Sequence, residues 1–296
     1  MTGLGNLTRR NSKLFFKDKG MFFTSLITPV ILLVLYATFL AKVYRDSFAS
    51  AVPQGFELDS SLIDATVGGQ LISSLLAVCC ITVAFCSNML MVQDKVTGAL
   101  RDITVTPVKR STLAVSYYIA TVISTLLICL IATGAGFIYL AKAGWYLSAE
   151  DTALFVLDVI LLVLFGTALS SIINFFLSSQ GQISAVGTIV SAGYGFICGA
   201  YMPISQFGET LQHVLSFLPG TYGTSLLRNH ALSGVYQEMA DTGFPSETMR
   251  AIKDSVDCNL YFFDSKVEIG MMYLILAGST AVLIGIYIVM NLLKKR

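Results

Sequence analysis

Six long apolar runs constrain the fold of this chain more than any other feature of its sequence. A helix needs roughly 20 apolar residues to cross the hydrocarbon core of a bilayer. Runs near that length occupy residues 21–41, 71–92, 113–141, 153–177, 183–201 and 269–293. Because backbone polar groups inside lipid must bond within their own segment, such runs predict helices. We expect an all-α integral membrane protein whose residues 21–296 form a six-helix transmembrane domain.

The composition agrees with a surface that faces lipid. Only 12% of the 296 residues are charged and 55% are hydrophobic, whereas soluble domains average about 25% charged residues. The net charge is +1, which argues against a nucleic-acid partner held by a basic field. The first apolar run lacks a small-residue cleavage site, so we interpret it as a retained helix rather than a signal peptide.

Lysine and arginine are unevenly distributed along the chain. Twelve of the nineteen basic residues lie in three short segments that six spans would place on one side, namely the N-terminal segment, the connection at 93–110 and the C-terminal tail. Only three acids accompany them, whereas fourteen acids belong to the other side. Short loops rich in basic residues stay in the cytoplasm. We therefore expect a multi-pass protein of the plasma membrane with both termini cytoplasmic.

The N-terminal segment, residues 1–20, alternates basic and apolar side chains. Its basic residues include Arg9, Arg10, Lys13 and Lys17, and its apolar ones include Leu7, Leu14, Phe15 and Phe16. This pattern predicts a cytoplasmic amphipathic helix that lies on the anionic inner leaflet and connects to the first span. The alternative is that these charges only set the topology.

The connection at residues 93–110 reads QDKVTGALRDITVTPVKR. Four apolar residues recur at the spacing of one helical face, namely Val96, Ala99, Leu100 and Ile103. Pro107 cannot continue a helix. We expect a short amphipathic helix over residues 93–106 at the membrane surface. It is either a plain interfacial linker or a helix that docks into a groove on a cytoplasmic partner.

The outer segment between the fifth and sixth spans, residues 202–268, begins with an apolar part. One apolar stripe there is formed by Ile204, Phe207, Leu211, Val214, Leu215 and Leu218. Pro219 and Gly220 interrupt the stripe, and a second apolar pattern follows. We expect two short helices that enter the outer leaflet without spanning it, because helices satisfy their own backbone groups in lipid. The alternative is a pair of surface helices with no role in transport.

Asp158 lies about two turns into the fourth expected span from its outer end. An ionisable residue at membrane depth is a functional-site hypothesis by default, so Asp158 is an intramembrane polar site or a residue near the outer interface. We expect no other acid, base or histidine well inside a span. His213 and His230 are expected to face solvent or lipid headgroups.

The six cysteines show no metal-binding spacing, so we expect no metal site. Most of them lie in apolar runs, where cysteine acts as a small hydrophobe. A disulfide between Cys198 and Cys258 remains open, because sequence alone does not fix their spacing.

Two connections carry a family resemblance. The inner connection resembles the coupling-helix signature of type-2 ABC transporter permeases at Asp94, Gly98, Leu100, Thr106, Pro107 and Arg110. The outer segment is similar to the region after the fifth helix of the same family at Gly199, Pro203, Pro219, Thr221, Tyr222, Leu227, Arg228 and Gly234. The resemblance covers most of the chain.

The resemblance implies a non-catalytic permease subunit of an ATP-driven exporter. Its coupling residues would be Asp94, Gly98, Leu100, Arg101 and Pro107. The chain has no P-loop of its own, so ATP and Mg²⁺ would be held by two copies of a nucleotide-binding ATPase subunit. The other implied partners are a second permease copy in a homodimer, membrane lipid and an amphipathic or hydrophobic export substrate.

The implied substrate is a drug, toxin, peptide or lipid-like molecule, because the outer loops are longer than those of the family's polysaccharide exporters. Export of a polysaccharide or teichoic acid is the alternative within transport. An ATP-independent channel or secondary transporter is an alternative of another class, but it would need a charged intramembrane network. A membrane enzyme would need convergent catalytic residues, which the sequence does not indicate.

Overall fold

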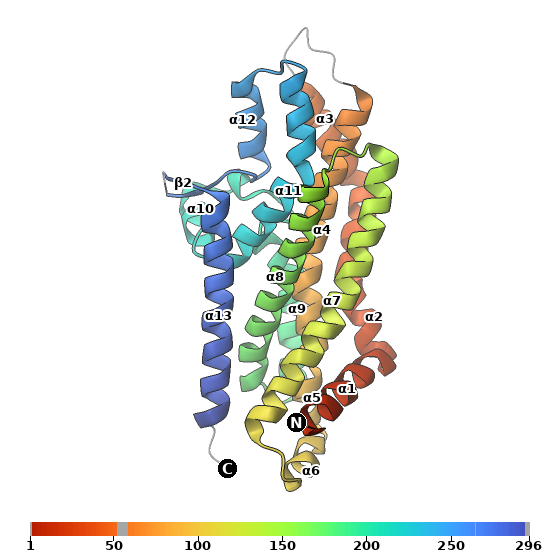
Figure 1. Cartoon of the computed structure of the whole chain (residues 1–296), viewed down its shortest axis with the longest axis vertical. Helices are drawn as coiled ribbons and strands as arrows, with labels where there is room; N and C mark the ends of the chain where they lie inside the picture. The colour runs from red at the N-terminus through yellow and green to blue at the C-terminus, as the bar shows by residue number, and fades with distance from the viewer. Residues whose placement is uncertain (1, 52–58, 264, 294–296) are drawn as a thin grey trace.

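The computed structural model describes residues 2–51, 59–263 and 265–293. Long helices run side by side along the long axis of the molecule, and short helices lie at both ends (Figure 1). The start of α1, the short helix α6 and the end of α13 share one end, which we call the basic end. The helices α3 and α12 lie at the opposite end (Figure 1).

The elements follow one another with short connections. From the N-terminus they are α1 (Thr2–Lys17), α2 (Lys19–Leu35), the π-helical stretch η1 (Tyr36–Leu40), α3 (Ala41–Ala51), α4 (Ser60–Asn88), α5 (Leu90–Val96), α6 (Ala99–Val105), α7 (Arg110–Ala143), α8 (Ala149–Phe176), α9 (Gln180–Ile197), the 3₁₀ turn η2 (Ile204–Gln206), α10 (Glu209–Leu215), α11 (Pro219–Asp241), α12 (Ser246–Ser255), β1 (Leu260–Phe262), β2 (Ser265–Val267) and α13 (Ile269–Leu293). The strands β1 and β2 form one antiparallel hairpin in which Leu260 pairs with Val267.

Five helical segments of the described chain are long and apolar enough to cross a membrane. They cover Lys19–Asp46, Ser60–Val96, Arg110–Ala143, Ala149–Phe176 and Ile269–Leu293. The expected all-α membrane fold is therefore confirmed, whereas the count of six is not. The remaining predicted span, 183–201, corresponds to α9, which has only 18 residues and begins with Gln180, Gly181 and Gln182. At 1.5 Å per residue it is slightly shorter than the hydrocarbon core.

The helix α4 is the centre of the bundle. It is buried along most of its length and packs against α2, α7, α8, α9 and α11. Leu76, Cys80 and Ile81 on this helix are fully buried. In contrast, α2 and α13 expose large apolar side chains such as Ile31 and Leu274. Such faces would be costly in water but are stable against lipid, so these helices form the rim of a membrane-embedded bundle.

Side-chain caps explain where several helices begin. Asp18 accepts a hydrogen bond from the N–H of Met21 and starts α2 directly after the amphipathic α1. Ser148 and Asp151 cap each other's backbone N–H groups at the start of α8. Ser179 and Gln182 do the same for α9. These reciprocal caps satisfy donors that a helix end otherwise leaves open, so short turns join α7, α8 and α9.

The helix expected over residues 93–106 is interrupted. The helix α5 ends at Val96, and α6 begins at Ala99. Between them Gly98 takes a left-handed conformation with φ of 85°, which glycine adopts without steric cost. The apolar periodicity across this point therefore reflects two short helices and not one.

The outer segment also differs from the expectation of two short helices that enter the outer leaflet without spanning it. The first helix, α10, is short, but α11 has 23 residues and is largely buried between α4 and α8. A Cβ atom at Gly234 of α11 would overlap the carbonyl oxygen of Tyr146. This close approach leaves no room for a side chain at Gly234 and places α11 against the α7–α8 turn.

Candidate functional site

The segment formed by α5, the turn at Thr97 and Gly98, and α6 lies at the basic end of the bundle (Figure 1). It contains four of the five predicted coupling residues, and the fifth, Pro107, follows α6. The structure places them in two different environments. Asp94 is buried on α5, whereas Arg101 and Pro107 are exposed on and after α6. Gly98 and Leu100 are half-buried between them.

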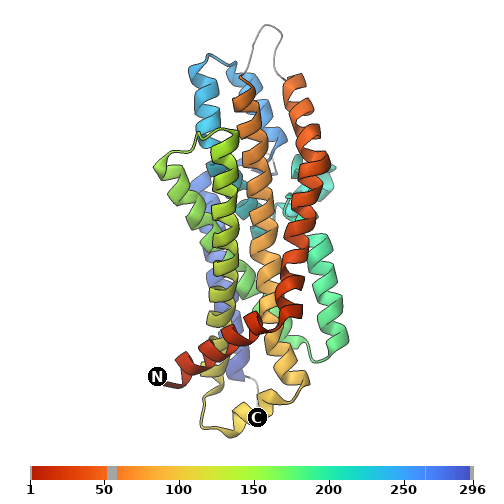
Figure 2. The same cartoon turned by 90° about the vertical axis from the view of Figure 1, so that its right-hand side faces the viewer.

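Asp94 joins three helices. Arg10 of α1 donates two hydrogen bonds to its carboxylate, at 2.6 and 3.0 Å. The hydroxyl of Tyr117 on α7 donates a third. The hydrogen bond to Asp94 raises the pKa of the Arg10 guanidinium. In Figure 2 the helix α1, in red, crosses the lower part of the bundle where these contacts form. Asp94 therefore holds the segment to α1 and α7 and is not available to a partner chain.

The next residue, Lys95, binds the end of α8. Its Nζ atom donates to the carbonyl oxygens of Asn174, Phe175 and Leu177 at 2.9 to 3.1 Å. The last carbonyls of a helix have no partner within the helix and carry the negative end of its dipole. A cation at this place therefore stabilises the C-terminus of α8 and ties it to α5. The role of Lys95 had no sequence signal, because its acceptors are backbone atoms about 80 residues away.

The helix α6 itself projects from the bundle. None of its residues is buried. Val105 is 86% exposed, the largest value among the exposed large apolar residues of the described chain. Leu100 turns the other way and lines a pocket of about 120 Å³ with Tyr117 and Tyr287. The segment thus presents one face to α7 and α13 and leaves the opposite face open.

The opposite half of the molecule contains a second polar centre. Arg228 on α11 is fully buried and donates to the carbonyl oxygens of Val256 and Gly199, to Asp257 and to Ser74. Asp257 also accepts the backbone N–H groups of Ile204 and Ser205. Burial raises the pKa of Asp257, and the guanidinium of Arg228 opposes that effect. Arg228 and Gly199 both belong to the family-like outer pattern, so this pattern encodes a buried structural hub.

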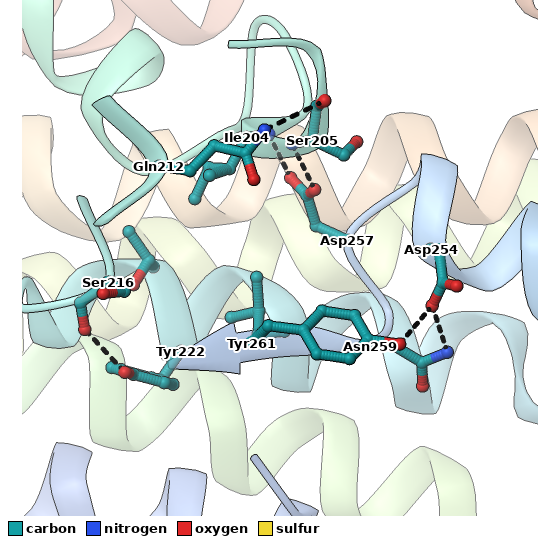
Figure 3. A pocket seen from close by; sticks show the side chains of 11 residues that line it. Ile204, Ser205, Gln212, Ser216, Tyr222, Asp254, Asp257, Asn259 and Tyr261 are labelled. Carbon is teal, nitrogen blue, oxygen red and sulfur yellow. Dashed lines mark hydrogen bonds between the residues drawn. The ribbon is translucent and has the colours of Figure 1, made fainter. Parts of the chain in front are cut away.

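A pocket of about 240 Å³ lies next to this hub. Figure 3 shows its wall, which is formed by the loop after α9, by α10, by the start of α11 and by the chain after α12. Asp257 points toward Ile204 and Ser205, which also line the pocket. Asp254, Asn259 and Tyr261 form a hydrogen-bonded group on another side. No local sequence pattern indicates this pocket, because its residues come from four separate segments of the chain.

Asp158 lies in a buried polar cluster. His230 Nδ1 is 2.6 Å from one carboxylate oxygen, and the hydroxyl of Tyr273 donates to the other at 2.6 Å. The expectation that His230 faces solvent or headgroups is therefore wrong, since its side chain is buried against α8. Its helix, α11, packs inside the bundle and not on the surface. His213 stacks on Phe263 at the hairpin. Cys198 and Cys258 are both buried free thiols.

The long apolar helices define an integral membrane protein of the all-α class. Residues 2–231 match the family described as ABC-2 type transporter. Because the match covers more than half of the chain, the protein belongs to this family of transport permeases. The matched residues include the inner connection and most of the outer pattern. No curated protein matches the chain.

Proposed function

We propose that this protein is the transmembrane permease subunit of an ATP-binding-cassette exporter. It moves a drug, toxin, peptide or lipid-like substrate out of the cell, and a separate nucleotide-binding subunit hydrolyses the ATP. The basic end faces the cytoplasm, and the membrane is the plasma membrane. In this proposal α9 is a sixth, short span. The helices α10 and α11 form the outer segment that does not cross.

The observation that carries this proposal is the exposed face of α6. Val105, which is 86% exposed, lies at the end of a helix outside the bundle, where the surface of a partner subunit would cover it. Arg101 is exposed on the same short helix. An amphipathic helix in a complementary groove is a common mode of protein recognition. The groove would belong to the nucleotide-binding subunit.

The contacts of α5 would transmit a displacement of α6 to the membrane-spanning helices. A displacement of α6 pulls on α5, which is bound to α1 and α7 through Asp94 and to α8 through Lys95. Charged hydrogen bonds of this kind are short and directional. The segment therefore acts as a lever on three helices. Leu100, Gly98 and Pro107 set its shape, and Arg101 belongs to the docking face.

Co-purification with the nucleotide-binding subunit tests the docking role. The two chains are co-expressed, and the permease is isolated by an affinity tag. Val105→Asp and Arg101→Glu should remove the ATPase subunit from the complex while the permease itself keeps its size in gel filtration. Arg250→Glu, which changes an exposed arginine on α12, is the matched control and should retain it. Unchanged assembly and unchanged substrate-stimulated ATPase activity in the first two variants would reject the coupling role.

The functional unit in this proposal contains two permease copies and two ATPase subunits. Polysaccharide or teichoic-acid export is the alternative substrate class. An ATP-independent channel or secondary transporter is the alternative mechanism. Transport by proteoliposomes that contain the permease alone would favour that mechanism, whereas a strict requirement for the ATPase subunit and ATP supports the exporter.

A further inference from the structure

The pocket beside the Arg228–Asp257 hub is lined by hydroxyl groups whose hydrogen atoms are already used. Five hydroxyl groups reach it, and each donates to an acceptor within the protein. Ser205 donates to Ser255, Ser216 to His213, Thr221 to Leu218, Tyr222 to Ser216 and Tyr261 to Asp254. A hydroxyl has one hydrogen to give, so these groups offer a ligand only lone pairs.

The amide and acidic side chains of the pocket also offer a ligand mainly hydrogen-bond acceptors. Gln212 donates through Nε2 to the carbonyls of Ser205 and Phe207, which leaves its Oε1 atom. Asn259 donates one of its two Nδ2 hydrogens to Asp254 Oδ1, which also accepts from Tyr261. Among the described residues, none donates a hydrogen bond to Asp254 Oδ2, Asn259 Oδ1 or Gln212 Oε1. The pocket therefore presents acceptors, and one of them is a carboxylate.

The acceptors lie at two ends of the pocket. In Figure 3, Asp254 and Asn259 are together on one side and Gln212 is on the other. Leu260, Ile204 and the rings of Tyr222 and Tyr261 contribute the apolar surface between them. The volume of about 240 Å³ is several times the roughly 30 Å³ of one water molecule. A ligand of a few heavy atoms with donors at both ends fits this arrangement.

We propose that this pocket binds a small organic ammonium ion with a second donor group, such as an amino alcohol. The ammonium group donates to Asp254 and Asn259, and the second group donates to Gln212. A cation gains from the carboxylate, and aromatic side chains nearby also favour it. Phosphate or carboxylate groups on a ligand would be repelled by the Asp254 carboxylate and would find, among the side-chain groups described above, one unused hydrogen, the second on Asn259 Nδ2. A free amine is therefore favoured over the ethanolamine headgroup of a phospholipid. The site goes beyond the proposed export function and does not depend on it.

Arg250 is the cation that competes for this carboxylate. It is fully exposed on α12, and Tyr261 and Asp254 raise the pKa of its guanidinium. When the Arg250 side chain is removed, the negative charge of Asp254 interacts with the ligand alone. We therefore expect the Arg250→Ala variant to bind a small ammonium ion about twofold or more tightly at low salt, where exposed charges are least screened.

Calorimetric titration of the full chain in phosphatidylcholine nanodiscs tests the site. The probes are 4-aminobutan-1-ol, n-butylamine and butane-1,4-diol. The amino alcohol should bind best, butylamine more weakly and the uncharged diol not measurably. Asp254→Asn should weaken the amino alcohol at least tenfold, since a hydrogen bond to a charged group contributes about 1.5–3 kcal/mol. Asp241→Asn, at an exposed acid on the end of α11, is the control and should bind as the original chain does.

Several outcomes would overturn this proposal. These are equal binding of diol and amine, unchanged affinity in a folded Asp254→Asn variant, or weaker binding in Arg250→Ala. Nanodiscs with phosphatidylethanolamine distinguish the two amine sources, because competition by that lipid would assign the site to a headgroup and contradict a free ligand. A thermal melt of each variant separates a lost contact from a lost fold. None of these measurements requires ATPase activity, so their failure leaves the export proposal intact.

Discussion

Arg10 and Asp94, 84 residues apart, form a two-bond ion pair that joins the N-terminal helix α1 to α5. Asp94 is almost fully buried, whereas Arg10 keeps about a third of its side chain exposed. The exposure of the pair is therefore intermediate between that of a surface ion pair, which contributes up to about 1 kcal/mol to stability, and that of a buried one. The pair ties α1 to α5 at the basic end of the bundle.

Arg10→Ala and Asp94→Ala should each destabilise the protein by about 1–3 kcal/mol, because each leaves a partly desolvated charge without its partner. Urea unfolding in detergent, followed by circular dichroism, gives the free energies. The double variant should cost clearly less than the sum of the two single ones. Arg9→Ala changes an exposed neighbour and should have almost no effect. Additive costs would show that the pair does not interact.

Lys95→Met should loosen the C-terminus of α8. The substitution keeps an unbranched apolar stem but removes all three hydrogen bonds to the carbonyls of Asn174, Phe175 and Leu177. Hydrogen–deuterium exchange should accelerate in peptides that cover residues 172–180, while peptides from the middle of α7 keep their rates. Lys109→Met, at an exposed lysine before α7, serves as the control. Unchanged exchange at the end of α8 would show that Lys95 does not stabilise the C-terminus of this helix.

Gly98→Ala should impair coupling through conformation alone, because no atom lies within 4 Å of the added Cβ. The left-handed conformation costs a non-glycine residue roughly 1–2 kcal/mol, and asparagine tolerates it better. Substrate-stimulated ATPase activity of the complex should therefore fall in the order glycine, asparagine, alanine, proline. Gly243 has a similar φ of 78° and equally open space, but it lies after α11. Gly243→Ala should cost similar stability without changing ATPase activity, and equal activity losses would refute a special role for Gly98.

Asp257→Ala should destabilise the outer hub by about 3–5 kcal/mol, because it leaves the fully buried charge of Arg228 without its carboxylate. It also leaves the N–H groups of Ile204 and Ser205 without an acceptor. Combining it with Arg228→Met removes the buried charge and should recover part of the loss. Chemical unfolding measures both variants, with Asp241→Ala as the exposed control. If the double variant loses more stability than the two single variants together, the proposed interaction between Asp257 and Arg228 is contradicted.

Asp158 and His230 should show a measurable coupling energy despite the 72 residues between them. Asp158→Ala leaves the buried polar atoms of His230 and Tyr273 without their acceptor, which costs about 1–3 kcal/mol. Asp158→Asn retains an acceptor and should cost less. Glu150→Ala, at an exposed acid in the first turn of α8, should be neutral. Identical stability of the alanine and original proteins would show that the cluster is unimportant for the fold.

Hydropathy predicted the long helices well because it is a local property. The last span was expected over 269–293, and α13 covers those residues. The expected span 113–141 likewise corresponds to α7. The span expected over 183–201 is not confirmed, because α9 has only 18 residues and glutamines at its start. Hydropathy also could not distinguish a lipid-facing helix from a buried one, so the depth of α11 was unexpected.

The polar sites were less predictable because their partners are distant in sequence. Asp94 was expected to be a coupling residue, but its ion pair with Arg10, 84 residues away, leaves no local sequence pattern. His230 lacked an apolar surrounding run and therefore appeared to be a surface residue. The resemblance did identify Gly98, Arg228 and Gly234, since each occupies a position with a strict steric or electrostatic requirement. The resemblance indicated which residues matter but not which residues they contact.

Site-specific photocrosslinking from Val105 tests the central claim most directly. All six native cysteines are buried, so a benzophenone maleimide should label a Val105→Cys variant at that position. After illumination of cell membranes, mass spectrometry identifies the attached chain. Our account predicts a nucleotide-binding subunit with a P-loop, joined through its surface groove, and no such product from a cysteine at Arg250. Attachment to lipid alone, or to proteins without a P-loop, would contradict it.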